Sequence, residues 1–245
     1  MPNVWLLGMR PRTLTMAAVP IIVGSTLAWA QGAAPDWVTF AVTLLCAVLI
    51  QIGTNLFNDA NDGERGADGP DRIGPVRITG SGLAKPRQVR RAAIACFVAA
   101  LAMGVYLVVV GGLPILLIGI ASLVAGYAYS AGSKPLSHGP FGEVYVIVFF
   151  GLIAVAGSYY LQSKQLPASA VLLTGIAIGC YAAAVLLVNN LRDTEADLRA
   201  GRKTLAARLG VQGSRRLYGL LVLAPFPILA AALGVQAIGL VWLGL

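Results

Sequence analysis

The sequence is poor in charged side chains, and in acidic ones above all. Only 11% of its 245 residues are Asp, Glu, Lys or Arg, against about 25% in an ordinary soluble domain. Ten acidic residues stand against 18 Lys and Arg residues, which gives a formal net charge of +8, and 58% of the residues are hydrophobic. So few charges cannot cover a water-facing surface, which excludes a disordered chain, a coiled coil and a solvated enzyme domain.

Histidine and cysteine are also scarce, and this argues against two kinds of site. His138, in a polar loop, is the only histidine, so a catalytic triad built on histidine is excluded. Cys46, Cys96 and Cys180 stand singly within apolar stretches and lack the spacing of a zinc site or a disulfide framework. We therefore expect the cysteines to serve packing.

Long apolar runs make up most of the chain, and crossing a bilayer takes about 20 such residues. The runs do not alternate apolar and polar residues with period two, which excludes an outer-membrane barrel. We predict an all-α polytopic transmembrane helical bundle, a single domain over residues 1–245, with about seven spans and a partial eighth at 234–245. The predicted spans are roughly 14–30, 38–57, 89–110, 113–129, 144–161, 169–191 and 217–233.

The basic residues predict the orientation of this bundle. All 18 Lys and Arg residues except Lys164 fall in loops on one side of the predicted membrane. Because such loops stay in the cytoplasm, the N-terminus is expected to be cytoplasmic in a multi-pass protein of the cell inner membrane. The same bias accounts for the basic excess without a nucleic-acid partner.

Eight of the ten acidic residues lie in two segments, within the predicted cytoplasmic loops 55–88 and 189–213. The first segment leaves the end of the second predicted span. Four of its polar residues share one helical face through the spacing i, i+3, i+4, i+7: Asn55, Asn58, Asp59 and Asp62. Amides and carboxylates thus occupy positions that an apolar stripe normally takes, which indicates a binding site.

The second segment follows Asn189 and Asn190 at the end of the sixth predicted span. Asp193 and Asp197 form an i, i+4 pair on one helical face, and carboxylates at that spacing repel at a membrane boundary unless a cation offsets them. Mg2+ suits the pair because it binds through one or two carboxylates while substrate phosphates complete its octahedron. The sequence therefore predicts a pyrophosphate clamped through Mg2+ between two Asp-rich helices. The alternative is a pair of solvated helix ends neutralised by arginines.

Basic residues near these segments are candidates for the remaining phosphate oxygens, or for the carboxylate of an acceptor. They are Arg72, Arg77, Lys134, Arg202 and Lys203. About half of the basic residues in such loops are expected to anchor lipid headgroups instead.

Both Asp-rich motifs resemble those of the UbiA-type intramembrane prenyltransferases. More narrowly, four stretches resemble the 1,4-dihydroxy-2-naphthoate polyprenyltransferases of the menaquinone pathway, and they occur in the right order along most of the chain. They are residues 10–14, residues 55–82, Gly142-Glu143-Val144 with Phe149-Phe150-Gly151, and residues 189–210, which include Gly201-Arg202-Lys203-Thr204. Relative to the usual nine spans of this family, about the last two are missing from the chain.

The resemblance implies a reaction and a set of ligands. A polyprenyl group passes from polyprenyl diphosphate to 1,4-dihydroxy-2-naphthoate, CO2 and pyrophosphate leave, and demethylmenaquinol forms within the lipid bilayer. The family pattern assigns two Mg2+ ions to Asp59, Asp62, Asp193 and Asp197. Asn55, Asn58, Asn189 and Asn190 are the implied helpers, and Tyr129 and Lys134 resemble the polar loop after the fourth helix of the family.

Three alternatives stay open. Another UbiA-type aromatic prenyltransferase, acting on 4-hydroxybenzoate or a similar acceptor, shares the Asp motifs. A CDP-alcohol phosphatidyltransferase motif begins like Asp59-Ala-Asn-Asp62-Gly63, but two further aspartates that this motif needs are absent. A membrane transporter is less favoured, because the acidic residues crowd one predicted membrane face, whereas transporter sites lie near the midplane.

Overall fold

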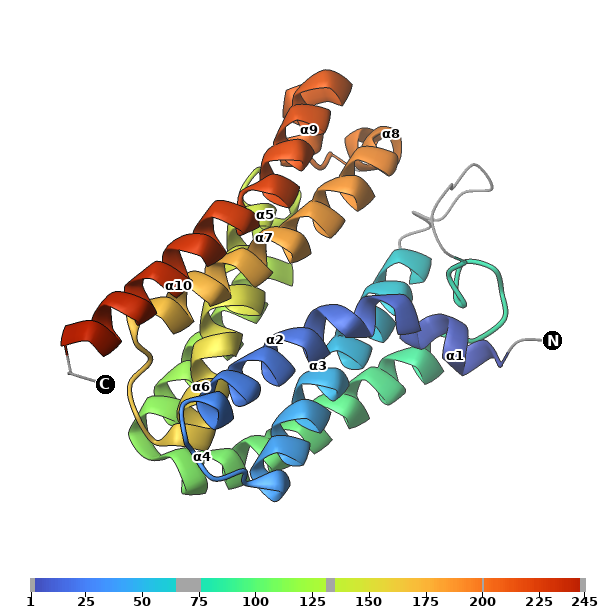
Figure 1. The fold of residues 1–245 in the computed structure, drawn as a ribbon. Coiled ribbons are helices and arrows are strands. Elements are labelled where there is room, and N and C mark those ends of the chain that lie inside the picture. Colours follow the sequence, from blue (N-terminus) through green and yellow to red (C-terminus); the bar gives the residue numbers. More distant parts are fainter. Residues whose placement is uncertain (1–2, 65–75, 131–134, 200, 243–245) are drawn as a thin grey trace.

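The computed structural model describes residues 3–64, 76–130, 135–199 and 201–242, and every regular element in these ranges is helical (Figure 1). This confirms the predicted all-α class. The elements are α1 (Val4–Met9), α2 (Pro11–Ala30), α3 (Trp37–Glu64), α4 (Pro86–Ser130), the 3-10 turn η1 (Leu136–His138), α5 (Gly142–Val146), the π-helical η2 (Ile147–Ile153), α6 (Ala154–Ser163), α7 (Ser169–Arg192), α8 (Thr194–Arg199), α9 (Leu205–Leu223) and α10 (Pro225–Trp242).

Six helical segments of the described chain are long and apolar enough to cross a bilayer. One of them, Pro86–Gly126, corresponds to two predicted spans, 89–110 and 113–129. Gly112 (φ 65°, ψ −153°) interrupts α4 between these two spans, where the sequence predicts a break. Val109 is 80% exposed and Leu113 is 65% exposed, so large apolar side chains near this break face outward. An outward apolar surface of this extent suits a lipid environment, and the chain is a multi-pass membrane protein.

The C-terminal part differs from the prediction. A span over 217–233 and a partial eighth span from 234 were expected. Instead, α9 runs from Leu205 to Leu223 with an interruption at Gly210 (φ 65°, ψ −176°), and α10 continues from Pro225 through Gly234 to Trp242. Glycine is tolerated within an apolar helix because ending the helix in lipid would leave backbone groups without hydrogen bonds. The predicted partial eighth span is therefore not a separate element of the described chain.

The helices form two groups that meet through α2 (Figure 1). In the first group α3 packs along α4 and α2 lies against α3; in the second, α7 contacts η2, α9 and α10. Helix α2 joins the groups by packing on α6 and α7. The end of α3, α8 and the start of α9 lie at one end, which we call the polar end; the α2–α3 and α6–α7 connections lie at the other.

At the end opposite the polar end, Asp36 caps the start of α3. Its Oδ1 accepts a hydrogen bond from the Thr39 amide (3.0 Å) and its Oδ2 from the Thr39 hydroxyl (2.6 Å). These bonds lower the pKa of Asp36 below its ordinary value. Gln162 of α6 secures the same turn, because its Oε1 accepts from the Trp29 indole (2.9 Å) and from the Asp36 amide (3.0 Å).

Asp36→Ala is expected to lower the free energy of unfolding by about 1 kcal/mol at neutral pH, the usual effect of losing an N-cap. Because folding lowers the pKa of Asp36, its charge stabilises the fold above the ordinary aspartate pKa, and this contribution is lost as the pH falls through the lowered value. Thermal unfolding in detergent at neutral and acidic pH measures the difference from wild type, which should shrink on acidification. Asp36→Asn, which keeps an acceptor oxygen, is the control; a difference that grows in acid would contradict the prediction.

Close packing of η2 on α7 depends on Gly151. A Cβ at Gly151 would meet the carbonyl oxygen of Gly175 and lie 2.5 Å from Gly179 Cα. Backbone atoms cannot rotate away, so Gly151→Ala is expected to destabilise the fold by about 1–3 kcal/mol, seen as a lower Tm in detergent. Gly157→Ala is the matched control, because its Cβ would have Ile118 Cδ1 as its nearest neighbour at 3.6 Å. Equal Tm values for the two variants would contradict this account.

Candidate active site

Asn55 begins the first Asp-rich segment, in the last turns of α3. It is 5% exposed, and its Nδ2 donates to the Met9 carbonyl and to Thr13 Oγ1, both at 2.9 Å. Asn58 follows on the same helix and is half-buried. Asn55 therefore ties the junction of α1 and α2 to α3, a structural role beside the predicted one in substrate binding.

Asp59 is fully buried and closes a turn that folds back onto α3. Its Oδ2 accepts from the Ile78 amide (3.0 Å), and its Oδ1 accepts from the Thr79 amide (2.9 Å). The single hydroxyl hydrogen of Thr79 is shared, because Thr79 Oγ1 lies 2.6 Å from both Oδ1 and the backbone carbonyl oxygen of Asp59. Gly63 makes room for this approach, since a Cβ there would lie 2.7 Å from Thr79 Cβ. Two backbone amides thus occupy two of the about four lone-pair sites of the carboxylate, and the Thr79 hydroxyl competes for a third. We call residues 78–82 the Asp59 turn.

Other predicted residues of this region are only partly described. Arg77 precedes the Asp59 turn and is half-buried, and its carbonyl accepts from the Ser81 amide at 3.0 Å. Arg72, Lys134 and the side chain of Asp62 lie outside the described residues. Their roles in binding metal or substrate stay predictions.

The second Asp-rich segment joins α7 to α8. The Asp193 carbonyl accepts from the Asp197 amide at 2.9 Å, so the two aspartates share one helical turn as the spacing predicts. Arg192 donates to both carboxylate oxygens of Asp193 at 2.8 Å. Asp197 is 9% exposed, and an Arg202 guanidinium nitrogen lies 3.5 Å from its Oδ1. Each carboxylate has an adjacent guanidinium, which offsets their mutual repulsion.

These aspartates fit a hard cation that shares its ligands with a substrate. Within the described ranges, no three His, Cys, Asp or Glu side chains gather closely enough to hold a metal by themselves. Mg2+ needs only one or two carboxylates when phosphate oxygens and water supply the remaining ligands. Asp193 and Asp197 on one turn meet that requirement.

A third polar group lies around Glu143, which the sequence did not mark as a site residue. Glu143 at the start of α5 is 3% exposed, and Asn190 of α7 donates from its Nδ2 to Glu143 Oε1 at 3.0 Å. Tyr129, at the end of α4, interacts electrostatically with both Glu143 and Arg202. We call these four residues the Glu143 cluster. It brings together three predicted substrate-binding residues, Tyr129, Asn190 and Arg202, around an acid.

Tyr129 lies just beyond the apolar segment Pro86–Gly126 and remains a neutral phenol. Burial, reinforced by the negative charge of Glu143, raises the pKa of Tyr129 to about 12. Its hydroxyl therefore stays a hydrogen-bond donor at physiological pH. The ring stacks on Tyr145 (centroids 4.5 Å apart), which stacks on Phe149 (4.6 Å), so the three rings form an aromatic row.

The remaining predicted residues of this region lie next to the Glu143 cluster in the chain. Asn189 is half-buried beside Asn190. The Lys203 amide donates to the His138 carbonyl at 2.8 Å, which fastens the loop after α8 to η1. Glu143 itself had two signals in the sequence: it belongs to one of the four stretches that resemble the family, and with Asp36 it is an acid outside both Asp-rich segments.

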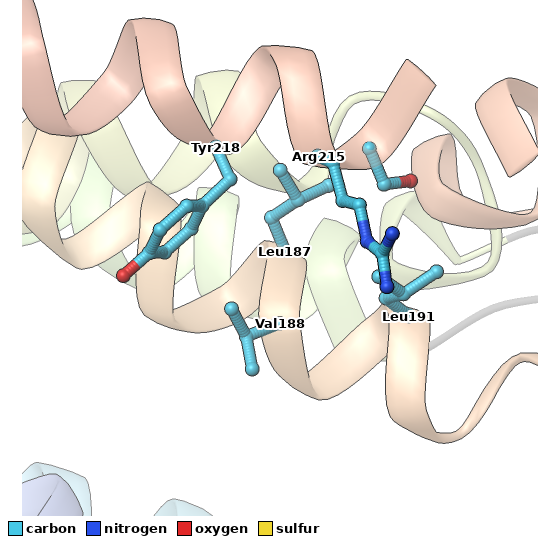
Figure 2. A pocket seen from close by; sticks show the side chains of 6 residues that line it. Leu187, Val188, Leu191, Arg215 and Tyr218 are labelled. Carbon is cyan, nitrogen blue, oxygen red and sulfur yellow. The ribbon is translucent and has the colours of Figure 1, made fainter. Parts of the chain in front are cut away.

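A small apolar groove lies between α7 and α9, with a volume of about 220 Å3 (Figure 2). It is lined by Leu187, Val188, Leu191, Ser214, Arg215 and Tyr218. In Figure 2, Arg215 lies beside Leu191, and Tyr218 lies at the other end. Leu191 is two residues before Asp193, so the groove begins next to the second Asp-rich segment.

An apolar helical bundle with two Asp-rich segments at one end defines an intramembrane protein whose polar site lies at one membrane face. The chain belongs to the UbiA prenyltransferase family, which matches residues 17–245. It is a prenyltransferase of the membrane-embedded type.

Individual relatives and solved structures agree with this membership. The chain is 39% identical over 232 residues to the 1,4-dihydroxy-2-naphthoate octaprenyltransferase of Escherichia coli (strain K12), covering 92% of this chain and 75% of that protein. It is 40% identical over 222 residues to the enzyme of the same name from Mycobacterium tuberculosis, covering 90% and 75%. A UbiA homolog from Archaeoglobus fulgidus bound to DMAPP and Mg2+ shares the fold, with a TM-score of 0.68 and 17% identity over 96% of this chain and 86% of that one.

Proposed function

We propose that this protein transfers a polyprenyl group from polyprenyl diphosphate to 1,4-dihydroxy-2-naphthoate, with loss of CO2 and pyrophosphate, forming demethylmenaquinol in menaquinone biosynthesis. The observation that carries the proposal is the identity of 39% and 40% to two 1,4-dihydroxy-2-naphthoate octaprenyltransferases, over 92% and 90% of this chain. The paired aspartates of the polar end supply the donor type that a diphosphate with Mg2+ requires.

Four carboxylates are the proposed metal ligands: Asp59, Asp62, Asp193 and Asp197. Mg2+, when bound, takes up the charge that develops on the leaving pyrophosphate; two ions are proposed. Asp59 contributes one or two lone-pair sites, because the Ile78 and Thr79 amides occupy two of about four and the Thr79 hydroxyl competes for a third. Solved UbiA homologs bound to Mg2+ with DMAPP or GPP support the use of this ion.

Basic and amide side chains of the polar end are the proposed partners of the two substrates. Arg202 and Lys203 follow Asp197 closely, and their cationic groups suit phosphate oxygens. The same role, or binding of the acceptor carboxylate, is proposed for Arg72, Arg77 and Lys134. Asn55, Asn58 and Asn189 complete the polar surroundings of the diphosphate.

The apolar bundle excludes water from the reacting carbon. An allylic cation formed when pyrophosphate leaves is captured by water unless water is kept out. Leu187, Val188 and Leu191 give the groove of Figure 2 an apolar lining next to Asp193, which suits part of the isoprenoid chain. The rest of the tail extends among the lipids.

For the cell, we propose the inner membrane, with the N-terminus and both Asp-rich segments on the cytoplasmic side. The support is the distribution of the 18 Lys and Arg residues in the sequence, all of which except Lys164 fall between the predicted spans on one side of the membrane. Both substrates of the proposed reaction then meet at the cytoplasmic face.

The test is an assay of membranes that contain the protein, with labelled polyprenyl diphosphate, 1,4-dihydroxy-2-naphthoate and Mg2+. Prenylated naphthoquinol and released CO2 are expected, and EDTA should abolish both. Absence of product, or product that persists in EDTA, would refute the proposal. Adding 4-hydroxybenzoate as a competing acceptor tests which branch of the family the activity belongs to. If 4-hydroxybenzoate is prenylated in preference to the naphthoate, the activity is that of another branch.

A further inference from the structure

Glu143 is a buried acid that the proposed transfer leaves without a role. It opens the apolar segment Gly142–Ser163 and is 3% exposed. Asn190 engages its Oε1, whereas Oε2 is buried and has no hydrogen-bond partner in the described part of the chain. Burying an unpaired carboxylate oxygen is costly, and an ionisable side chain within a membrane segment marks a functional site by default.

Packing alone does not account for an acid at this position. A glutamine would have the same size, and its oxygen would accept the hydrogen bond from Asn190 equally well. A carboxylate adds a second acceptor, Oε2, and a negative charge that both oxygens share. The side chain is therefore suited to a donor group that the described chain does not itself provide.

The surroundings of Glu143 indicate the shape of that donor. Tyr129, which Glu143 influences electrostatically, starts the aromatic row that continues through Tyr145 and Phe149. Flat aromatic faces attract another aromatic ring through offset stacking. Asn190 lies three residues before Asp193, about one helical turn of 5 Å. A ring at this place would lie close to a diphosphate bound at the second Asp-rich segment.

We propose that Glu143 Oε2 accepts a hydrogen bond from a ring hydroxyl of the aromatic acceptor, whose ring lies against the row of Tyr129, Tyr145 and Phe149. This rests on the proposed function, because it takes the acceptor to be a hydroxylated naphthoate. A hydroxyl bonded to a carboxylate donates more electron density to its ring. The attacking ring carbon thereby becomes a better nucleophile.

The reaction balances without a change at Glu143. The ring carbon forms a bond to the prenyl carbon, while the bond from that carbon to the diphosphate oxygen breaks. The bond between the ring and the carboxylate carbon of the naphthoate then breaks and CO2 leaves. The electron pair of that bond restores the aromatic ring. No proton is taken up or released at Glu143, which keeps the hydrogen bond throughout. Asn190 acts as a positioning residue through Oε1.

The test measures equilibrium binding in lipid nanodiscs by intrinsic fluorescence, without Mg2+ and without prenyl diphosphate. The probes are 1,4-dihydroxy-2-naphthoate and 1,4-dimethoxy-2-naphthoate, which cannot donate a hydrogen bond. Wild type should bind the dihydroxy compound about 10–100-fold more tightly, the usual range for a hydrogen bond to a charged group. E143Q should lose most of this preference. In the prenylation assay it should raise the KM for the naphthoate by a similar factor and leave the KM for polyprenyl diphosphate unchanged.

Gln162→Ala is the matched control, because Gln162 is a buried amide of the same membrane segment at the opposite end. It should keep the wild-type preference. If wild type binds both probes equally well, the inference is overturned by the wild-type protein alone. The inference therefore remains testable even if E143Q does not fold. A preference retained in E143Q, or lost in Gln162→Ala as well, also overturns it. When the inference about Glu143 is overturned, the prenylation assay decides on the proposed function separately. If wild type prenylates the naphthoate, the proposed function stands; if it does not, the proposed function fails as well.

Discussion

Asp197→Asn is expected to reduce prenyl transfer at least about a hundredfold while the protein keeps its fold. Asp197 is 9% exposed, and its carboxylate and that of Asp193 belong to one helical turn. An amide keeps the size of the side chain but offers one neutral oxygen, which Mg2+ binds far less well. Asp193→Asn should cause a loss of the same order. The measurement is kcat at saturating concentrations of both substrates and Mg2+.

Glu195 supplies the matched control for these variants. It belongs to the same segment, lies between the two aspartates in the chain and is exposed. Glu195→Gln removes the same charge and should keep activity close to wild type. Turnover retained in Asp197→Asn at saturating Mg2+ would contradict the metal assignment. An equal loss in Glu195→Gln would show that only the net charge of the segment matters.

Features that depend on local spacing are the ones that the sequence predicted well. Apolar runs of bilayer length predict the spans, and the pair Gly111–Gly112 predicts the interruption of α4, which occurs at Gly112. The i, i+4 relation of Asp193 and Asp197 appears as a hydrogen bond between their backbones. Each of these follows from the geometry of one helix, so neighbouring residues contain the necessary information.

Contacts between distant segments were not predictable in the same way. Asp59 accepts from Thr79, 20 residues later, and Asn190 donates to Glu143, 47 residues earlier. Helical periodicity shows which residues share a face, but it does not show which loop folds back onto that face. The spacing of Asn55, Asn58, Asp59 and Asp62 therefore indicates a binding site but gives no sign of the structural role of Asp59. The same limit explains why Glu143 was given no role.

Asp59→Asn is expected to release the Asp59 turn as well as to impair transfer. The carboxylate accepts hydrogen bonds from the Ile78 and Thr79 amides, and the Thr79 hydroxyl is shared between Oδ1 and the Asp59 carbonyl. An asparagine provides one acceptor oxygen, and its NH2 group would face a donor, so at least one buried amide loses its partner. A hydrogen bond to a charged group contributes about 1.5–3 kcal/mol. Amide hydrogen exchange over residues 76–84 should therefore accelerate about tenfold to a hundredfold.

The two roles of Asp59 are separated by measuring exchange without Mg2+ and without substrates, where only the turn contributes. Thr79→Ser keeps both the amide and the hydroxyl that bind Asp59, and it should leave exchange over residues 76–84 near the wild-type rate. If exchange is unchanged in Asp59→Asn while Mg2+-dependent transfer is lost, the hydrogen bonds to Ile78 and Thr79 do not hold the turn. Asp59 would then act through the metal alone. If exchange accelerates and transfer is lost together, the turn and the diphosphate site depend on the same buried carboxylate, as its bonds to two backbone amides and its remaining lone-pair sites indicate.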